Sequence, residues 1–325
     1  MIVDFHNHFY PPQYIDEIAK GPSFYKVTHD DDGNPVVHSP GDYNVIVPGH
    51  RLIDTRLQVI ADAGVDMQVL TFTAPGTIVE TPERSVELAK KVNDILGSIV
   101  MDHSDNFTAL ATLPLNDPEA CVLELERVIN GLGLKGVMLY SNANGVALSD
   151  ERFWPMYEKA NQLNAVLYIH PTYPVGVEAM EDFMLMPLLG FTFDTTLAAA
   201  KLVFTGIPER YPKIKWVLAH LGGTIPYLSE RLDRGYENFP ESRKFIDRPP
   251  SEYLKKFYYD TVNFDVKALQ FAIDFAGVDQ IMAGSDYPHM IGSLSKMKES
   301  IAQLNLSDQD KAKIYGENAL GLLGL

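Results

Sequence analysis

The sequence predicts an α/β fold, a distorted (β/α)8 TIM barrel in which a single domain spans residues 1–325. Three observations support this prediction. The chain has 325 residues, a length typical of one such barrel. Short apolar segments rich in β-branched residues alternate with helix-patterned stretches, which indicates a parallel sheet with crossover helices. There are eight of these short segments, so closure of the sheet into a barrel is favoured.

Each candidate strand is a short apolar run, and the helices between the strands begin with recognisable start signals. Thr81-Pro82-Glu83, Asn116-Asp117-Pro118-Glu119 and Ser149-Asp150-Glu151 each place a capping residue before the acidic residues of a first turn. The predicted strands cover residues 2–6, 66–72, 107–113, 134–140, 165–170, 214–220, 257–262 and 280–286.

Three segments depart from this alternation and are predicted to be insertions after strands one, five and six. Residues 9–50 contain Pro11-Pro12 and an acidic turn at 30–35, which predicts irregular structure with a small hairpin. Residues 171–195 predict a loop that either packs on the barrel or forms a pocket wall, since barrel enzymes build their sites on the loops after the strands. Residues 235–248 predict a charged, proline-bounded loop that caps the pocket or contacts another subunit.

Composition excludes several classes of function. The net charge of −16 argues against nucleic-acid binding, which needs a basic face. No run of 18 apolar residues and no basic-then-apolar leader is found, so no membrane partner is expected. Cys121 is the single cysteine, which rules out an internal disulfide and fits a reducing, cytoplasmic compartment.

Histidines and an aspartate stand at the ends of the predicted strands. His6 and His8 are spaced i, i+2, so both point to one face at the end of strand one. His170 ends strand five, His220 ends strand six and Asp286 ends strand eight. In a barrel these ends meet at one rim. The other histidines, apart from His289, are predicted to be exposed or locally bonded: His29, His38, His50 and His103.

Imidazole nitrogens with a carboxylate suit one divalent metal, Zn²⁺ first, with Mn²⁺, Fe²⁺ or Co²⁺ compatible with the same donors. We predict His6, His8, His170 and Asp286 as its ligands, with a further position left for water or substrate. His220 is either another ligand or a general acid/base. The second role is favoured because the following Leu221-Gly222-Gly223-Thr224 opens a helix and holds the ring on rigid backbone.

Taken together, these motifs resemble the amidohydrolase superfamily. They are His6-x-His8, His170-Pro171, Ala219-His220-Leu221-Gly222-Gly223 and Gly284-Ser285-Asp286-Tyr287-Pro288, and they are most similar to the branch of metal-dependent decarboxylases. Arg231-Leu232-Asp233 and the segment 248–253 are similar as well. The resemblance implies one metal held by the four predicted ligands, His220 as acid/base and commonly a homodimer. It also implies that an arginine at the position of Arg231 reaches the partner subunit's site to hold a substrate carboxylate.

The sequence departs from that branch at two places. Residues 41–45 lack the arginine that the branch uses from the insertion after strand one, and His289 stands where an aromatic residue is usual. A related carboxylate, such as an aromatic acid with a phenolic hydroxyl, is therefore as suitable a substrate. The strand-four end, Tyr140-Ser141-Asn142, also lacks the carboxylated lysine of two-metal members, which favours one metal.

Four residues are predicted to contact a small carboxylate substrate: Arg231, His289, Asn142 and Tyr173. Each has an alternative. Arg231 is otherwise a solvated charge, His289 bonds locally, Asn142 belongs to a turn and Tyr173 packs. Asp4 is expected to orient the strand or a histidine.

The predicted function is metal-dependent, non-oxidative decarboxylation of an unsaturated or aromatic carboxylic acid. His220 moves the proton, and Asp286 supplies it if the metal holds the carboxylate directly. The alternative is metal-assisted hydrolysis of a lactone or amide. A third interpretation is a barrel that binds a metal or ligand without turnover.

Overall fold

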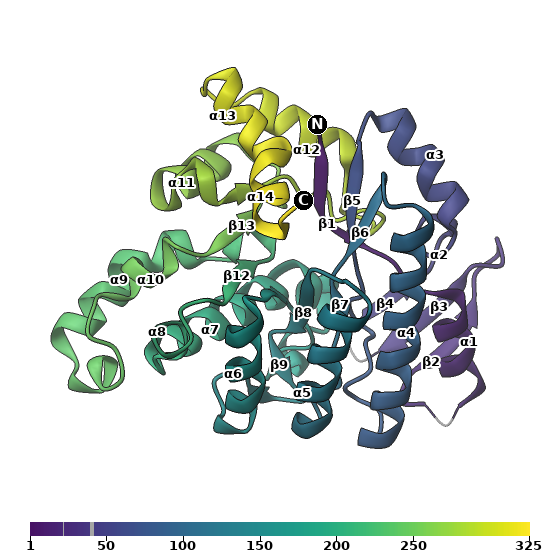
Figure 1. The fold of residues 1–325 in the computed structure, drawn as a ribbon, viewed down its shortest axis with the longest axis horizontal. Coiled ribbons are helices and arrows are strands. Elements are labelled where there is room, and N and C mark those ends of the chain that lie inside the picture. Colours follow the sequence, from purple (N-terminus) through teal and green to yellow (C-terminus); the bar gives the residue numbers. More distant parts are fainter. Residues whose placement is uncertain (22, 40–41) are drawn as a thin grey trace.

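The computed structural model describes residues 1–21, 23–39 and 42–325 (Figure 1). Within this part of the chain, eight strand segments run parallel around a central barrel. One of them is broken at Leu110 into β6 and β7. In chain order the strands are β1 (Val3–His8), β5 (Met67–Thr71), β6 (Phe107–Ala109), β7 (Ala111–Thr112), β8 (Gly136–Tyr140), β11 (Val166–His170), β12 (Lys215–Leu218), β13 (Tyr258–Asp260) and β14 (Ile281–Met282).

Backbone hydrogen bonds close the sheet between its first and last strands. Phe5 N donates to Ala283 O at 2.8 Å, and Asp286 N donates to His6 O at 2.8 Å. Asn7 and Tyr287 form a parallel bridge beyond these bonds. Because every neighbouring strand pair is parallel and the edges meet, the prediction of a (β/α)8 barrel is confirmed.

Two predicted strand ends are wrong. β12 ends at Leu218 and β14 ends at Met282, whereas the sequence predicted strands as far as His220 and Asp286. The reason is the backbone conformation of the functional residues themselves. His220 has φ 53° and Asp286 has φ 58°, a left-handed conformation that an extended ladder cannot include.

Helices lie outside the strands and close the apolar core (Figure 1). The predicted start signals are confirmed, since Thr81, Asp117 and Asp150 accept hydrogen bonds from backbone N–H groups of the first turns. The α-helices of the barrel are α3 (Ile53–Ala63), α4 (Pro82–Asp102), α5 (Pro118–Glu126), α6 (Trp154–Leu163), α7 (Phe191–Phe204), α8 (Ile207–Arg210), α9 (Ile225–Asn238), α10 (Pro250–Leu254), α11 (Val266–Ala276), α12 (Leu294–Ala302), α13 (Asp308–Ala312) and α14 (Asn318–Leu323).

The insertion after β1 is more regular than the sequence predicted. Helix α1 (Pro12–Lys20) is followed by an antiparallel sheet and by the short helix α2 (Pro48–Arg51). The sheet strands are β2 (Lys26–His29), β3 (Pro35–Ser39) and β4 (Asp42–Val45). Glu80 joins this insertion to the barrel, because its carboxylate accepts a 2.6 Å hydrogen bond from Ser23 Oγ. Part of the predicted segment 41–45, residue 41, lies outside the described residues.

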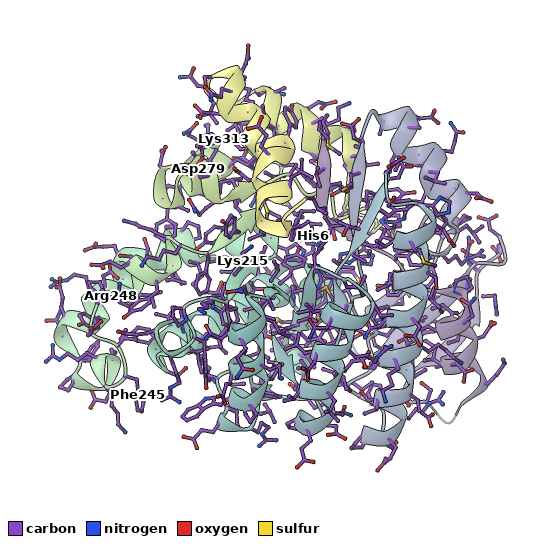
Figure 2. All side chains as sticks on the ribbon, in the orientation of Figure 1. His6, Lys215, Phe245, Arg248, Asp279 and Lys313 are labelled. Atoms are coloured by element: carbon purple, nitrogen blue, oxygen red, sulfur yellow. The ribbon has the colours of Figure 1, made fainter. Side chains whose placement is uncertain are left out.

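The other two insertions are partly helical. In the insertion after β11, 3-10 and π turns lead from Val177 into α7 at Phe191. A short antiparallel pair, β9 (Asn142–Ala143) and β10 (Val146–Ala147), follows β8 and lies outside the predicted insertions. Helix α9 continues to Asn238, and the segment after it projects away from the barrel; Figure 2 shows Phe245 and Arg248 there, far from His6.

One helical stretch, Asp182–Phe204, is by length and composition alone apolar enough to cross a membrane, with a hydropathy of 1.4. This is weak evidence for a span. Thr195, Ala199 and Leu202 of the same stretch are buried against the barrel, and 33% of the apolar window is buried.

Candidate active site

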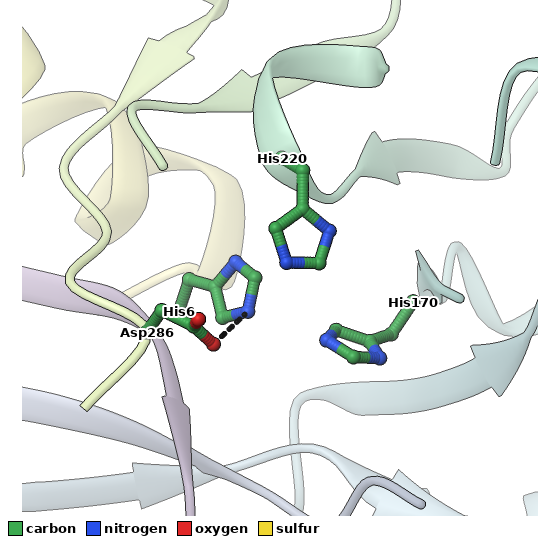
Figure 3. A group of neighbouring side chains, drawn as sticks. All are labelled: His6, His170, His220 and Asp286. Carbon is green, nitrogen blue, oxygen red and sulfur yellow. Dashed lines mark ion pairs between the residues drawn. The ribbon is translucent and has the colours of Figure 1, made fainter. Parts of the chain in front are cut away.

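Four strand ends bring histidines and an aspartate to one point inside the barrel rim. Figure 3 shows the rings of His6, His170 and His220 turned towards each other and towards Asp286. One ligand atom from each of these four residues lies within 4.8 Å of the others. His8 joins them, because its Nε2 is 3.1 Å from His6 Nε2 and 3.0 Å from Asp286 Oδ1. The residues predicted as metal ligands are therefore neighbours in space.

The hydrogen bonds of His6 fix which of its ring nitrogens carries the proton. Nδ1 lies 2.7 Å from Oδ2 of Asp260, a carboxylate that accepts from four other donors. Nδ1 must therefore be the protonated donor, which leaves Nε2 with a free lone pair unless a second proton is bound.

His8 and His170 are fixed in the same tautomer by different partners. Thr71 donates its hydroxyl proton to the carbonyl of Asn7, so Thr71 Oγ1 can only accept at 3.2 Å from His8 Nδ1. His170 Nδ1 is 2.9 Å from the carbonyl of Pro171, which also can only accept. Both rings thus present an unprotonated Nε2 to the cluster.

Unless His6 binds a second proton, three Nε2 lone pairs and a carboxylate oxygen therefore meet without a donor between them. His170 Nε2 is buried and has no partner anywhere in the described chain. Lone pairs 3.1 Å apart repel unless a cation lies among them, and a buried polar atom without a partner costs about 1–3 kcal/mol. Asp260 and Asp286 are both buried, so a charge of +2 would balance them. The residues present fit a divalent metal.

The pKa values of the cluster agree with this interpretation. Burial lowers the pKa of His6, but the charge of Asp260 and hydrogen bonds to Asp260 and Asp286 outweigh it and raise the pKa to about 10. Burial, with neighbouring histidines, holds the pKa of His8 and of His170 well below the ordinary value, so these rings are neutral. A metal in place of the extra proton on His6 satisfies all three rings.

Asp260, at the end of β13, is a functional residue that the sequence reasoning missed. Its carboxylate accepts from His6 Nδ1, from Tyr168 Oη at 2.9 Å and from the backbone N of His220 at 3.1 Å. It therefore positions two members of the cluster at once. The rule that selected Asp286, an acidic residue at the end of a predicted strand, would also have found Asp260 within 257–262.

His220 sits on a turn that requires glycine at positions 222 and 223. A Cβ on Gly222 would lie 2.5 Å from the Tyr259 ring, and a Cβ on Gly223 would lie 2.2 Å from Thr192 O. Both glycines also have positive φ. His220 Nδ1 is buried without a partner among the residues described. Burial and the neighbouring His6 lower the pKa of His220 to about 4, so the ring is neutral at pH 7.

A buried arginine supports the strand that carries His6 and His8. Arg56, on α3, donates to Asn7 Oδ1 at 2.6 Å, to Gln68 Oε1 at 3.1 Å and to the carbonyl of His8. Asp4, expected to orient the strand or a histidine, accepts hydrogen bonds from Ser285 and Gln68. It thereby ties β1 to the loop that bears Asp286.

Three of the predicted substrate contacts, Asn142, Tyr173 and Arg231, form no hydrogen bond with the histidines or the aspartate of the cluster in the described chain. The Asn142 amide donates to Asp194 Oδ2 at 2.8 Å and to Tyr173 O at 3.0 Å, so it holds the loop after β11. Tyr173 Oη donates to Ser39 Oγ at 2.6 Å. Arg231 is exposed on α9, and no hydrogen bond or ion pair joins it to another residue in the described ranges.

His289 lies against the cluster, and His50 lies behind it. The His289 ring is 4.5 Å from the His8 ring, and its Nδ1 is 3.3 Å from His50 Nε2. The prediction that His50 is exposed or locally bonded is wrong, because only 1% of it is exposed and its contact is 239 residues away in the chain. No local pattern indicates such a contact.

Fold and site together define a metal-binding barrel of the amidohydrolase type, and comparisons with known proteins agree. The amidohydrolase family model matches residues 3–325. A 2-amino-3-carboxymuconate-6-semialdehyde decarboxylase of Dictyostelium discoideum is 34% identical over 277 residues, 84% of this chain and 76% of that protein. A gamma-resorcylate decarboxylase of Rhizobium radiobacter is 27% identical over 312 residues, 88% of this chain and 92% of that protein. The chain belongs to the amidohydrolase family.

Solved structures share the fold. The 5-carboxyvanillate decarboxylase of Sphingomonas paucimobilis has a TM-score of 0.88 at 24% identity, covering 100% of this chain and 99% of that one. A dihydroxybenzoic acid decarboxylase of Polaromonas sp. JS666, with bound manganese and the inhibitor 2-nitroresorcinol, has a TM-score of 0.84 at 24% identity, covering 100% and 97%.

Proposed function

We propose that this protein is a carboxy-lyase that removes CO₂, without oxidation, from an aromatic or unsaturated carboxylic acid and depends on a divalent metal. The observation that carries the proposal is the convergence of His6, His8 and His170 on Asp286, with His170 Nε2 buried and without a partner among the residues described. The relatives support the reaction type, since those compared above are decarboxylases of aromatic acids or of a muconate semialdehyde.

We assign the metal to His6, His8, His170 and Asp286. When bound, a divalent cation supplies a Lewis acid that draws electron density from the substrate's oxygens. Zn²⁺ is our first choice because imidazole and carboxylate donors suit it, and metal analysis of the purified protein tests this against Mn²⁺, which the Polaromonas structure holds. Asp260 and Thr71 would hold the His6 and His8 rings in the tautomer that binds metal.

We assign proton transfer to His220. In the reaction a proton adds to the carbon that bears the carboxylate, the bond to the carboxylate carbon breaks, and its electron pair returns to the conjugated system. The carboxylate anion and one proton thus become CO₂ and the product that carries hydrogen in place of the carboxylate. A neutral imidazole beside the cluster can take a proton at a ring nitrogen and return it to carbon. Asp286 is the alternative donor.

The test is CO₂ release from a panel of hydroxybenzoates and muconate semialdehydes in D₂O. Deuterium should appear at the carbon that lost its carboxylate. His220→Ala should retain its metal and lose turnover at least about 100-fold, the typical contribution of general acid–base catalysis, whereas the surface control His103→Ala should retain both. Metal loss in His220→Ala would make it a ligand, and full turnover would leave Asp286 as the donor. Hydrolysis of lactones or amides without CO₂ release would overturn the proposal.

We propose that the protein is a homodimer, assembled through the α7 face. We define this face by four exposed side chains: Leu188 at 48%, Leu189 at 43%, Phe193 at 51% and Leu197 at 48%. Adjacent apolar side chains exposed in a row are typical of protein interfaces. The neighbouring helix α9 carries Arg231, which we propose reaches the partner's site and holds the substrate carboxylate with its guanidinium.

Light scattering tests the interface. The double variant Phe193→Lys, Leu197→Lys should give monomers, whereas the matched control Phe271→Lys, 49% exposed on α11, should remain dimeric.

Complementation tests the role of Arg231. A mixture of inactive Arg231→Ala and His220→Ala subunits should regain activity only if Arg231 acts across the dimer. No regain would place Arg231 in its own subunit's site or outside catalysis.

We further propose that residues 1–325 fold as one domain and that the protein is cytoplasmic. A single unfolding transition tests the first proposal and cell fractionation tests the second. The buried free thiol of Cys121 is consistent with a reducing compartment.

A further inference from the structure

Three tyrosine hydroxyls of the insertion after β1 donate to three successive carbonyls of the loop after β5. The pairs of donor and acceptor are Tyr10 with Ala74 at 2.5 Å, Tyr25 with Pro75, and Tyr14 with Gly76 at 2.6 Å. All three tyrosine side chains are buried, and a buried phenol hydroxyl usually has a hydrogen-bond partner. The insertion is therefore bonded to the backbone of residues 74–76.

This loop depends on the tyrosines because its carbonyls have little else to bond to. Among the described residues, no backbone N–H donates to the oxygen of Ala74, Pro75 or Gly76. Pro75 and Gly76 are buried, and a buried carbonyl without a donor is unfavourable. A Cβ on Gly76 would lie 2.5 Å from Tyr140 Oη, so the loop also fits closely against the end of β8. The loop backbone is thus held between the barrel and the insertion.

Thr73, the residue before this stretch, contacts the ring of His170. Thr73 is buried, and its Oγ1 lies 2.8 Å from His170 Nδ1. The same nitrogen lies 2.9 Å from the oxygen of Pro171, which can only accept, so the proton on Nδ1 is shared between two acceptors. Pro171 follows His170 directly in the chain. Thr73 therefore supplies the hydrogen bond that joins the ring to a different loop of the barrel.

The insertion also contacts the loop after β11, which begins after His170. Tyr173 of this loop donates its hydroxyl proton to Ser39 Oγ at 2.6 Å, and Ser39 ends β3 of the insertion. The two loops that supply the acceptors of His170 Nδ1 are therefore both bonded to the insertion. The position of the His170 ring follows from how the insertion lies on the barrel.

We infer that Thr73 is a positioning residue for the metal ligand His170, and that the insertion after β1 holds Thr73 in place through the three bonds between tyrosines and carbonyls. The inference rests on the assignment of His170 to the metal in the proposed function. With its Nδ1 proton held by two acceptors, the ring keeps Nε2 directed at the cluster before a metal binds. Without the Thr73 hydroxyl, the ring would be held at Nδ1 by Pro171 alone.

The test is the affinity of the full chain for Zn²⁺, measured by competition with a chelator. Thr73→Val keeps the shape of the side chain and loses the acceptor, so it should bind Zn²⁺ about 10- to 100-fold less tightly. Thr73→Ala is a second variant without the hydroxyl, should Thr73→Val not fold. Thr73→Ser keeps the hydroxyl and should bind within about threefold of wild type. Thr195→Val is the matched control, because the Thr195 hydroxyl is buried and has no partner in the described ranges.

A double-mutant cycle tests the role of the insertion. The pair of substitutions Tyr14→Phe and Tyr25→Phe should weaken Zn²⁺ binding about threefold or more when Thr73 is present. The same pair should have almost no effect in Thr73→Val, because the insertion acts through the Thr73 hydroxyl. Tyr157→Phe is the control: the Tyr157 hydroxyl donates to Leu148 O at 2.8 Å, the same kind of bond outside the insertion, and Zn²⁺ affinity should not change. Equal losses with and without the Thr73 hydroxyl would overturn the role of the insertion.

His170→Ala separates failure of the inference from failure of the metal assignment. If His170→Ala loses Zn²⁺ affinity while Thr73→Val binds within about threefold of wild type, Thr73 does not position the ligand and the inference is overturned. Unchanged affinity in His170→Ala would overturn the metal assignment and the inference with it. A protein whose variants bind Zn²⁺ as expected but which releases no CO₂ from any acid would overturn the proposed reaction and leave the positioning role of Thr73 standing.

Discussion

Replacing Asp260 by asparagine tests whether one carboxylate positions the cluster. Oδ2 of Asp260 accepts from His6 Nδ1 at 2.7 Å, Tyr168 Oη at 2.9 Å and His220 N at 3.1 Å, while Oδ1 accepts from Val262 N at 2.9 Å and Leu221 N at 3.3 Å. Asparagine has one oxygen that can accept and an amide nitrogen that cannot. At least two buried donors therefore lose their acceptor, whichever way the amide is oriented.

The expected loss is large compared with the stability of a typical domain. Each buried donor left without an acceptor costs about 1–3 kcal/mol, so two cost about 2–6 kcal/mol of a total that is usually about 5–15 kcal/mol. Without the negative charge on its Nδ1 side, His6 also binds metal less tightly. Substitutions of this kind lower metal affinity about 10- to 100-fold.

Equilibrium unfolding in guanidinium chloride and metal competition with a chelator measure the two effects. Asp265→Asn is the matched control: Asp265 is exposed and caps α11 by accepting from Ala268 N, and asparagine caps a helix equally well. It should change neither quantity. A free energy of unfolding within about 0.5 kcal/mol of wild type, with metal affinity within about threefold, would refute the positioning role of Asp260.

Three further predictions concern buried side chains that are not part of the histidine and aspartate cluster. Burial raises the pKa of Asp194 above its ordinary 3.8, so the folded protein binds a proton more readily than the unfolded chain, and the free energy of unfolding falls as the pH rises through this range. Asp194→Asn keeps an oxygen that accepts from Ser141 and Asn142, so the variant should be at least as stable as wild type at pH 7. The difference in free energy of unfolding between variant and wild type should shrink towards pH 4. A difference that grows on acidification would contradict this. Burial raises the pKa of the Cys121 thiol, so a thiol reagent should label it only after unfolding, and rapid labelling of the native protein would show that the thiol is accessible. Arg56→Met should cost about 3 kcal/mol or more in guanidinium unfolding, because several buried acceptors lose a charged donor, and a loss below about 1 kcal/mol would show that β1 does not depend on it.

The barrel and the main members of the cluster could be predicted because their signals are local. Apolar runs of strand length mark the eight strands, and Thr81, Asp117 and Asp150 mark helix starts by the chemistry of their own side chains. In a parallel barrel all strand ends meet at one rim, so His6 on β1 and Asp286 in the loop after β14 are near each other. The order of residues along the chain and their types were therefore enough to predict which side chains lie together at the barrel rim.

Tertiary structure decided how those groups are used. The tautomer of His6 depends on Asp260, 254 residues away, and the contact of His50 with His289 joins residues 239 apart. The left-handed backbone of His220 depends on the space that Gly222 leaves beside Tyr259. A periodic pattern records which face of an element is apolar, but the direction of a hydrogen bond depends on what the rest of the fold places opposite each atom, so the sequence alone could not supply it.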